Sequence, residues 1–177
     1  MPHPFFTIGH STRPLAEFVE LLKESRVGLV VDVRSMPRSR TNPQFNQDAL
    51  PTTLQDYQIA YQHMSLLGGL RNKQMPTEDS PNDYWRVKSF RRYADYALSE
   101  DFAEGLSDLK SVGDERRVAI MCAEAVWWRC HRRLIADYLL ASGEVVFHIL
   151  GVNNVQEATL TPGAHIMRDG KRIEYRA

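Results

Sequence analysis

The chain has 177 residues, of which 43% are hydrophobic and 25% are charged. This composition predicts a single globular domain over residues 1–177 with a substantial core, and it argues against a largely disordered chain. The 22 Lys and Arg residues balance the 22 Asp and Glu residues, which argues against a global attraction to nucleic acid or anionic membranes.

The opening residues, MPHPFFTIGHS, lack the basic segment and long apolar stretch of a signal peptide. No apolar run approaches the roughly 20 residues that span a bilayer, so we expect a cytoplasmic protein without membrane contact. The two cysteines, Cys122 and Cys130, are too few for a disulfide scaffold. In a reducing compartment they are expected to be thiols, thiolates or metal ligands, and a transient bond between them stays open.

In chain order, short apolar segments bounded by polar or glycine-containing turns predict strands at residues 5–8, 29–33, 59–64, 118–122 and 145–150. Apolar residues recur at helical spacing from Leu15, from Tyr93, from Phe102 and from Leu134. This alternation predicts a Rossmann-like α/β domain, with a mainly parallel open sheet of about five strands flanked by helices. Asp169 and Gly170 lie between two short extended runs and predict a C-terminal β-hairpin.

The connections carry their own signals. Ser11 or Thr12 is expected to cap the first helix, with Pro14 and Glu17 in its first turn. Residues 38–47 are expected to form an ordered loop, and residues 72–83, with two prolines and several acids, a mobile one.

The densest chemical cluster follows the fourth predicted strand, within the run VAIMCAEAVWWRCHRRLIAD at residues 118–137. A thiol near a helix amino terminus and close to arginines has a lowered pKa, which makes Cys122 a candidate nucleophile. Glu124 is a candidate proton carrier and Arg132 a candidate anion clamp. In the alternative interpretation, Cys122 and Cys130 are small buried hydrophobes, and Glu124 pairs with Arg132 to cap the helix.

Two further interpretations of this cluster are disfavoured. Cys130 and His131 are adjacent, so on a helix their side chains point about 100 degrees apart, which is poor for joint metal chelation. We therefore expect no metal and no cofactor. A strand, cysteine, loop and arginine also resemble the layout of cysteine phosphatases, but the six residues between Cys122 and Arg129 include no glycine to turn amides toward phosphate.

The first two predicted strands end in polar residues as well. His10 and Ser11 follow the first strand, and Asp32 and Arg34 close the second, where alternation places both on one face and predicts an ion pair. Arg34, Arg38 and Arg40 form a local basic cluster in a neutral chain. Because the carboxyl ends of parallel strands meet at one edge of a sheet, we expect these groups to converge with the cysteine cluster on one ligand site.

A second basic group, Arg86, Lys88, Arg91 and Arg92, surrounds Trp85 and Phe90 and suggests nucleic-acid contact. Acidic residues nearby favour an amphipathic helix with a solvated face instead.

Five stretches carry a family resemblance: TIGHS, DVRSMPRSR, YQHMSLLGG, SFRRYADY, and CAE followed by CHR. Together they resemble the bacterial and archaeal family catalogued as domain of unknown function 488. The resemblance implies a compact α/β fold and an intracellular location, and it implies no particular reaction. The positions that it marks are Gly9, His10, Ser11, Asp32, Arg34, Pro37, Ser39, Arg40, Gly68, Gly69, Cys122, Glu124, Cys130, His131 and Arg132.

The leading hypothesis is an enzyme acting on a small or nucleotide-like anionic substrate. Cys122, Glu124 and His10 are its expected catalytic residues, and the expected ligand-binding residues are Ser11, Asp32, Arg34, Arg40, Cys130, His131 and Arg132. One alternative is a module that binds a nucleotide or nucleic acid without turnover. Another is a structural or partner-binding domain in which the cysteines only pack.

Overall fold

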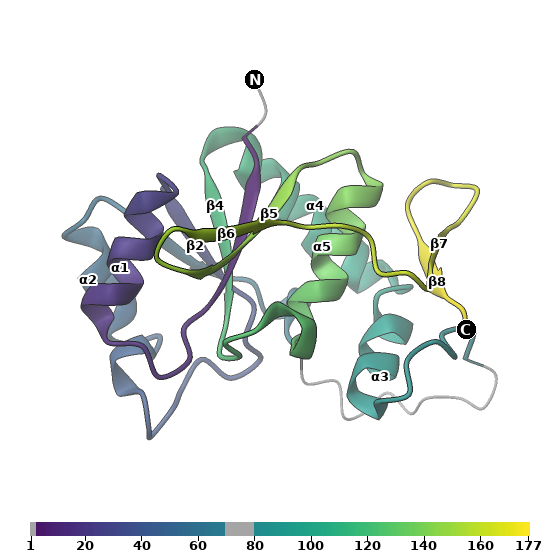
Figure 1. Cartoon of the computed structure of the whole chain (residues 1–177), viewed down its shortest axis with the longest axis horizontal. Helices are drawn as coiled ribbons and strands as arrows, with labels where there is room; N and C mark the ends of the chain where they lie inside the picture. The colour runs from purple at the N-terminus through teal and green to yellow at the C-terminus, as the bar shows by residue number, and fades with distance from the viewer. Residues whose placement is uncertain (1–2, 70–79) are drawn as a thin grey trace.

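The computed structural model describes residues 3–69 and 80–177, so most of the predicted loop at residues 72–83 lies outside the described residues. The six strands of the main sheet stand in the order β3-β2-β4-β1-β5-β6 (Figure 1). Their bounds are β1 (Phe5–Gly9), β2 (Leu29–Asp32), β3 (Ala60–His63), β4 (Val118–Cys122), β5 (Val146–Gly151) and β6 (Asn154–Glu157). β1 to β5 pair in parallel and β6 is antiparallel to β5. The predicted mainly parallel sheet is confirmed, with β6 as an additional strand.

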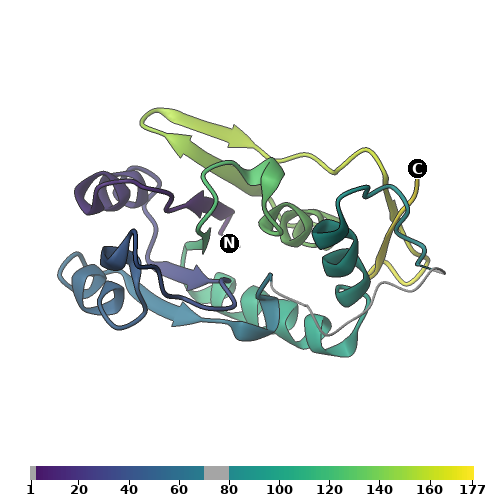
Figure 2. The ribbon, with the colours of Figure 1, turned by 90° about the horizontal axis from the view of Figure 1, so that it is seen from below.

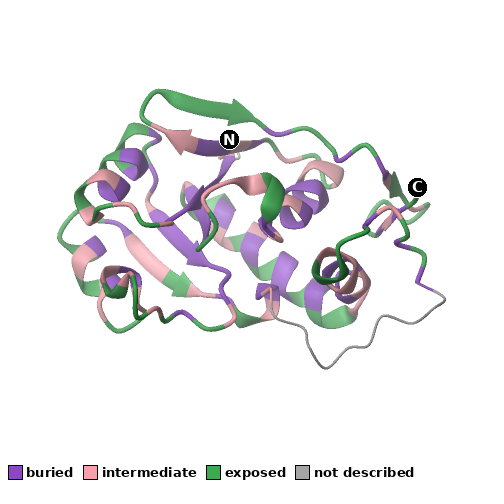
Figure 3. Cartoon of the chain, turned by 60° about the horizontal axis from the view of Figure 1, so that its bottom comes forward, coloured by how far each residue is buried: buried purple, intermediate pink, exposed green. Residues whose placement is uncertain are grey.

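Helices cover both faces of this sheet because its inner strands are apolar on both sides. α1 (Leu15–Glu24) and α2 (Leu50–Gln55) share one core cluster with Phe6 and Ile8 of β1. α3 (Lys88–Tyr96), α4 (Glu100–Glu115) and α5 (Arg132–Ala141) share the other with Phe5. The short helices η1 (Pro43–Phe45), η2 (Ser65–Leu67) and η3 (Trp127–Arg129) lie in connections at the carboxyl ends of strands. Figure 3 shows the buried strands between these helices and β6 exposed at the edge.

The turn from β1 into α1 differs from the expected one. The helix is preceded by Pro14, no side chain caps it, and Ser11 has a left-handed backbone with φ of 48°. The Ser11 amide donates instead to the carbonyl of Ala123, 3.0 Å away, and the Arg13 guanidinium binds the carbonyls of Gly9 and Leu150. The expected Ser11 or Thr12 cap is therefore wrong, because contacts with neighbouring strands fix this turn.

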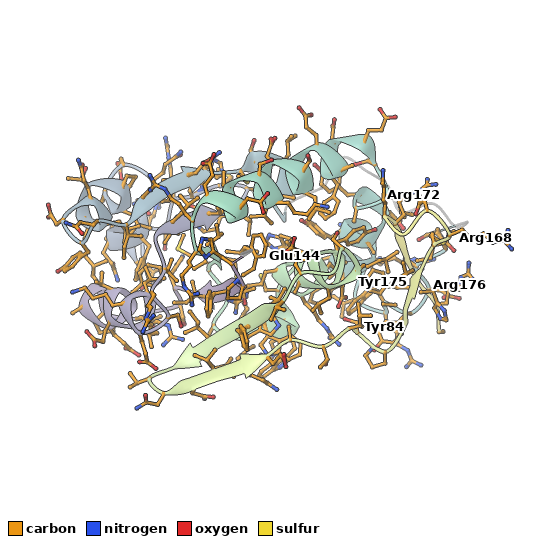
Figure 4. All side chains as sticks on the ribbon, turned by 90° about the horizontal axis from the view of Figure 1, so that it is seen from above. Tyr84, Glu144, Arg168, Arg172, Tyr175 and Arg176 are labelled. Atoms are coloured by element: carbon orange, nitrogen blue, oxygen red, sulfur yellow. The ribbon has the colours of Figure 1, made fainter. Side chains whose placement is uncertain are left out.

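The predicted C-terminal hairpin is confirmed as β7 (Ala164–Ile166) paired with β8 (Ile173–Tyr175). It docks on α5 through buried polar contacts. The Tyr175 hydroxyl donates to the Asp137 carboxylate at 2.8 Å, and the Tyr138 hydroxyl donates to the carbonyl of Ile173 at 3.3 Å. In Figure 4 Tyr175 and Tyr84 lie on the inner side of the hairpin, whereas Arg168 and Arg176 extend from its outer side.

Candidate active site

A cavity of about 680 Å³ opens beyond the carboxyl ends of β1, β2 and β4; Figure 2 looks toward this edge of the sheet. Gly9 of β1 pairs with Cys122 of β4, and the His10 amide donates to the Cys122 carbonyl at 2.9 Å. A Cβ at Gly9 would lie 1.7 Å from the Glu124 carbonyl oxygen, so only glycine allows this approach.

The structure brings most of the expected site residues together at one cavity. The described lining includes His10, Ser11, Arg34, Cys122, Glu124, Cys130 and His131. Asp32, Arg40 and Arg132 are absent from that described lining. Arg38, Arg129, Ser89 and Phe90 also line the cavity, although none of them was among the expected site residues.

The wall formed by the ends of β1 and β2 holds a closed ion pair. The Arg34 guanidinium donates from Nε to Asp32 Oδ1 at 2.9 Å and from Nη2 to Asp32 Oδ2 at 2.7 Å. The Tyr61 hydroxyl also donates to this carboxylate, and Arg34 Nη2 reaches the Phe45 carbonyl at 2.6 Å. The predicted pair of Asp32 and Arg34 is confirmed, and it fixes the Arg34 side chain in the wall.

His10 belongs to the same wall. Its Nδ1 donates to the Ser11 carbonyl at 2.8 Å, and its Nε2 accepts from Arg34 Nη1 at 3.2 Å. Burial, and then the charge of Arg34, lower the pKa of His10 although the Ser11 carbonyl and Asp32 oppose the shift. The ring stacks on Phe45 with centroids 4.6 Å apart. His10 is therefore neutral with both nitrogens engaged, which fits a positioning residue better than the expected proton relay.

The opposite wall holds the two cysteines. Their Sγ atoms lie 2.8 Å apart, and both residues are buried free cysteines. α5 begins at Arg132, and the Arg132 amide donates to Cys130 Sγ at 3.4 Å. Cys130, rather than Cys122, thus occupies the helix amino terminus.

The pKa values of these thiols move in opposite directions. Burial, followed by the hydrogen bond with Cys130, raises the pKa of Cys122. Burial alone would raise the pKa of Cys130, but the hydrogen bond with Cys122, the charge of Arg132 and the Arg132 amide together lower it. The expectation of a lowered pKa at Cys122 is wrong, because the helix terminus and the arginine favour ionisation of its neighbour.

His131 stands beside Cys130. Its Nε2 donates to the Val33 carbonyl at 2.9 Å, so in the neutral ring Nδ1 presents its lone pair to Cys130 Sγ, 3.4 Å away. A Cβ at Gly69 would lie 2.7 Å from this Nδ1 atom. Gly69 therefore leaves the imidazole room to face the thiol.

Arg132 is 1% exposed and lies behind the cysteines. Its Nη2 donates to the carbonyls of Glu124 and Ala125 at 3.1 and 3.2 Å, while Nε and Nη1 have no hydrogen-bond partner among the described residues. The alternative pairing of Arg132 with the Glu124 carboxylate is wrong, because Arg132 binds the Glu124 main chain and the Glu124 side chain is exposed. A buried guanidinium without a carboxylate favours an anion nearby, and Cys130, whose pKa the charge of Arg132 helps to lower, is a neighbouring group that can ionise.

The remaining expected residues divide by position. Arg38 and Arg129 are exposed cations on the cavity wall, whereas Arg40 is exposed outside its described lining. α3 buries Tyr93, Ala94 and Tyr96, as predicted for an amphipathic helix. Within residues 3–69 and 80–177, no three His, Cys, Asp or Glu side chains are grouped to hold a metal ion.

Comparison with known proteins gives one match. The family model described as "Domain of unknown function DUF488" matches residues 14–139. No curated protein and no solved structure matches the chain. No helix in the described part of the chain is long and apolar enough to cross a membrane.

Proposed function

The chain belongs to the DUF488 family, whose description names no activity, and we propose from its site that it is an enzyme in which the Cys130 thiolate attacks a small anionic substrate. The nucleophile lies in a cavity at the carboxyl edge of a parallel sheet, where open α/β folds bind their ligands. We also propose a cytoplasmic location, where the two thiols stay reduced.

One observation carries this proposal: the positive charge buried at Arg132 has no carboxylate partner among the described residues. Burying an unpaired charge is costly unless a counter-charge or hydrogen bonds compensate it. Ionisation of Cys130 provides that counter-charge, and the first amide of α5 stabilises the thiolate further. In this proposal, the charge of Arg132 and the amide at the start of α5 both stabilise the thiolate of Cys130.

His131 is the proposed partner for the thiol proton. Its Nδ1 lies 3.4 Å from Cys130 Sγ, and the hydrogen bond from Nε2 to the Val33 carbonyl fixes the ring orientation. The proton of Cys130 passes to Nδ1, which leaves a thiolate beside an imidazolium. This assignment replaces Glu124 as the proton carrier, since the charge of Glu124 opposes ionisation of Cys130.

Substrate binding is assigned to the exposed cations of the cavity wall. Arg38 and Arg129 line the cavity on different segments and can bind separate oxygens of a carboxylate or phosphate group. Arg34 is held by Asp32 and serves mainly to shape the wall.

Alkylation with an anionic reagent, iodoacetate, and a neutral one, iodoacetamide, tests the proposal. We expect Cys130 to be modified before Cys122, and the ratio of the iodoacetate rate to the iodoacetamide rate to exceed the ratio for free cysteine, because iodoacetate is anionic. Arg38→Gln and Arg129→Gln are each expected to lower this ratio severalfold, whereas Arg40→Gln, outside the described lining, leaves it unchanged. Modification of Cys122 first, or a ratio equal to that of free cysteine, contradicts the proposal.

A further inference from the structure

The nucleophile of this site has a second thiol in contact with it. Cys122 Sγ lies 2.8 Å from Cys130 Sγ, and both residues line the cavity. Transfer of an acyl or phosphoryl group from a cysteine needs only water or an acceptor to complete the reaction. A second thiol touching the first gives such reactions no advantage, but it completes thiol–disulfide exchange.

We propose that the cavity reduces small anionic disulfides, with Cys130 as the attacking thiolate and Cys122 as the resolving thiol. This inference rests on the proposed function, because it uses the same nucleophile and the same cationic wall. It adds the chemical class of the substrate and a role for Cys122.

The first step forms a mixed disulfide. The Cys130 thiolate attacks one sulfur of a disulfide R–S–S–R, the substrate S–S bond breaks, and one R–S⁻ group leaves. The proton held on His131 Nδ1 neutralises this leaving group, so one R–SH is released and Cys130 carries S–S–R. His131 is suited to this transfer because its Nδ1 already faces the reacting sulfur atom at 3.4 Å.

The second step releases the other half. Cys122 Sγ attacks Cys130 Sγ, a bond forms between the two cysteines, and the second R–S⁻ leaves with the proton that Cys122 gives up. The substrate gains two electrons and two protons, and the two cysteines lose them. A dithiol reductant then returns the pair to thiols and is itself oxidised to a disulfide.

The positions of the two cysteines match these roles. Cys130 is at the amino terminus of α5, where its anion is stabilised, and Cys122 ends β4 with its Sγ 3.6 Å from the Glu124 carbonyl. Cys122 is 2% exposed, so it is shielded from solvent oxidants but touches the sulfur that it must attack. A protonated, shielded thiol beside a thiolate keeps the order of the two steps fixed.

The cavity favours an organic disulfide over a small peroxide. Its volume of about 680 Å³ lies in the range of sites for small organic molecules. Arg38 and Arg129 line it, while Phe90 and Met36 add apolar surface. A disulfide with carboxylate groups on both halves fits this mixture of charge and apolar surface.

The test uses the full-length reduced protein and oxidised glutathione as the anionic disulfide, with acid quenching and mass spectrometry. The wild type is expected to lose two hydrogens and form the intramolecular disulfide. Cys122→Ser and Cys122→Ala are expected to stop with one glutathionyl group on Cys130, and Cys130→Ser to form no such adduct. Cystamine, a cationic disulfide, is expected to react about tenfold more slowly, relative to its rate with free cysteine.

Several outcomes overturn the inference. One is a stable glutathionyl adduct on the wild type. Another is the absence of a trapped adduct on both Cys122 variants when their thermal unfolding matches that of the wild type. The third is faster oxidation by tert-butyl hydroperoxide than by oxidised glutathione. Iodoacetate separates the two proposals. Selective alkylation of Cys130 without reaction toward oxidised glutathione overturns the disulfide substrate alone, whereas failure of both reactions overturns the proposed function as well.

Discussion

Two buried arginines beside the cavity, Arg34 and Arg132, differ in how their charges are balanced. On the β1 and β2 wall, the guanidinium of Arg34 meets the carboxylate of Asp32 through two hydrogen bonds. Beside β4 and α5, the guanidinium of Arg132 donates only to main-chain carbonyls, and its charge lowers the pKa of the Cys130 thiol. Burial alone therefore does not decide how the charge of an arginine is balanced. A buried charge drives ionisation of a neighbour only where no carboxylate already balances it.

The largest expected effect on stability comes from removing the carboxylate that pairs with Arg34. Asp32→Asn leaves the buried Arg34 charge without its partner, so we expect the free energy of unfolding to fall by about 3–5 kcal/mol. Urea unfolding measures this loss. Asp48→Asn removes the same charge from an exposed position and is expected to stay within about 0.5 kcal/mol of the wild type. A loss below about 1 kcal/mol for Asp32→Asn would show that the pair is not a structural element.

A pH series tests the effect of the Arg132 charge on His148 of β5, whose ring stacks on Trp127 and whose Nδ1 lies 2.6 Å from Thr7 Oγ1. Burial, and then the charges of Arg132 and Arg133, lower the pKa of His148 from 6.5 to about 3. Between these two pKa values the unfolded chain binds a proton at His148 that the folded chain does not bind. The contribution of neutral His148 to the free energy of unfolding is therefore fully present above pH 6.5 and is lost as the pH falls toward 3. The expected slope is at most about 1.4 kcal/mol per pH unit.

The measurement is urea unfolding between about pH 6.5 and 5.5, a window above most carboxylate pKa values. His148→Gln is expected to flatten the stability profile there, because glutamine does not titrate. Equal slopes for variant and wild type would mean that His148 gains a proton in the folded protein as readily as in the unfolded chain.

The next expected effect is on the alkylation rate of Cys130. Arg132→Met removes the charge that favours the Cys130 thiolate, so the alkylation rate of Cys130 at neutral pH is expected to fall about tenfold for each unit by which the pKa rises. Arg133→Met, one residue along α5, is a matched control because Arg133 binds Thr161 and stacks over Trp85. Its rate is expected to stay within about twofold of the wild type. Equal rates for both variants would remove Arg132 from the account.

Much of the fold follows from local patterns. The strands β1, β2 and β4 are buried at every position and stand out as short apolar runs. β6 has four exposed residues, NVQE, and so carries no such pattern. The mainly parallel arrangement follows from the alternation of strands and helices, which also predicted that His10, Arg34 and Cys122 would meet.

The roles within the site were harder to predict. The apolar periodicity of α5 begins at Leu134, so it does not reveal that the helix starts at Arg132 or which cysteine precedes it. Arginine is rarely buried, so nothing in the sequence marks Arg132 as a core residue. Ser89 and Phe90 reach the cavity from a distant segment through tertiary packing.

Titration of the thiolate is the most direct test of the central claim, that Cys130 is the ionised sulfur of this site. The ultraviolet absorbance of the thiolate, followed against pH, is expected to rise with a midpoint below the value of about 8.5 for free cysteine. That transition is expected to be absent from Cys130→Ser. A midpoint at or above the free value, or a low-pH transition that persists in Cys130→Ser, would contradict the account.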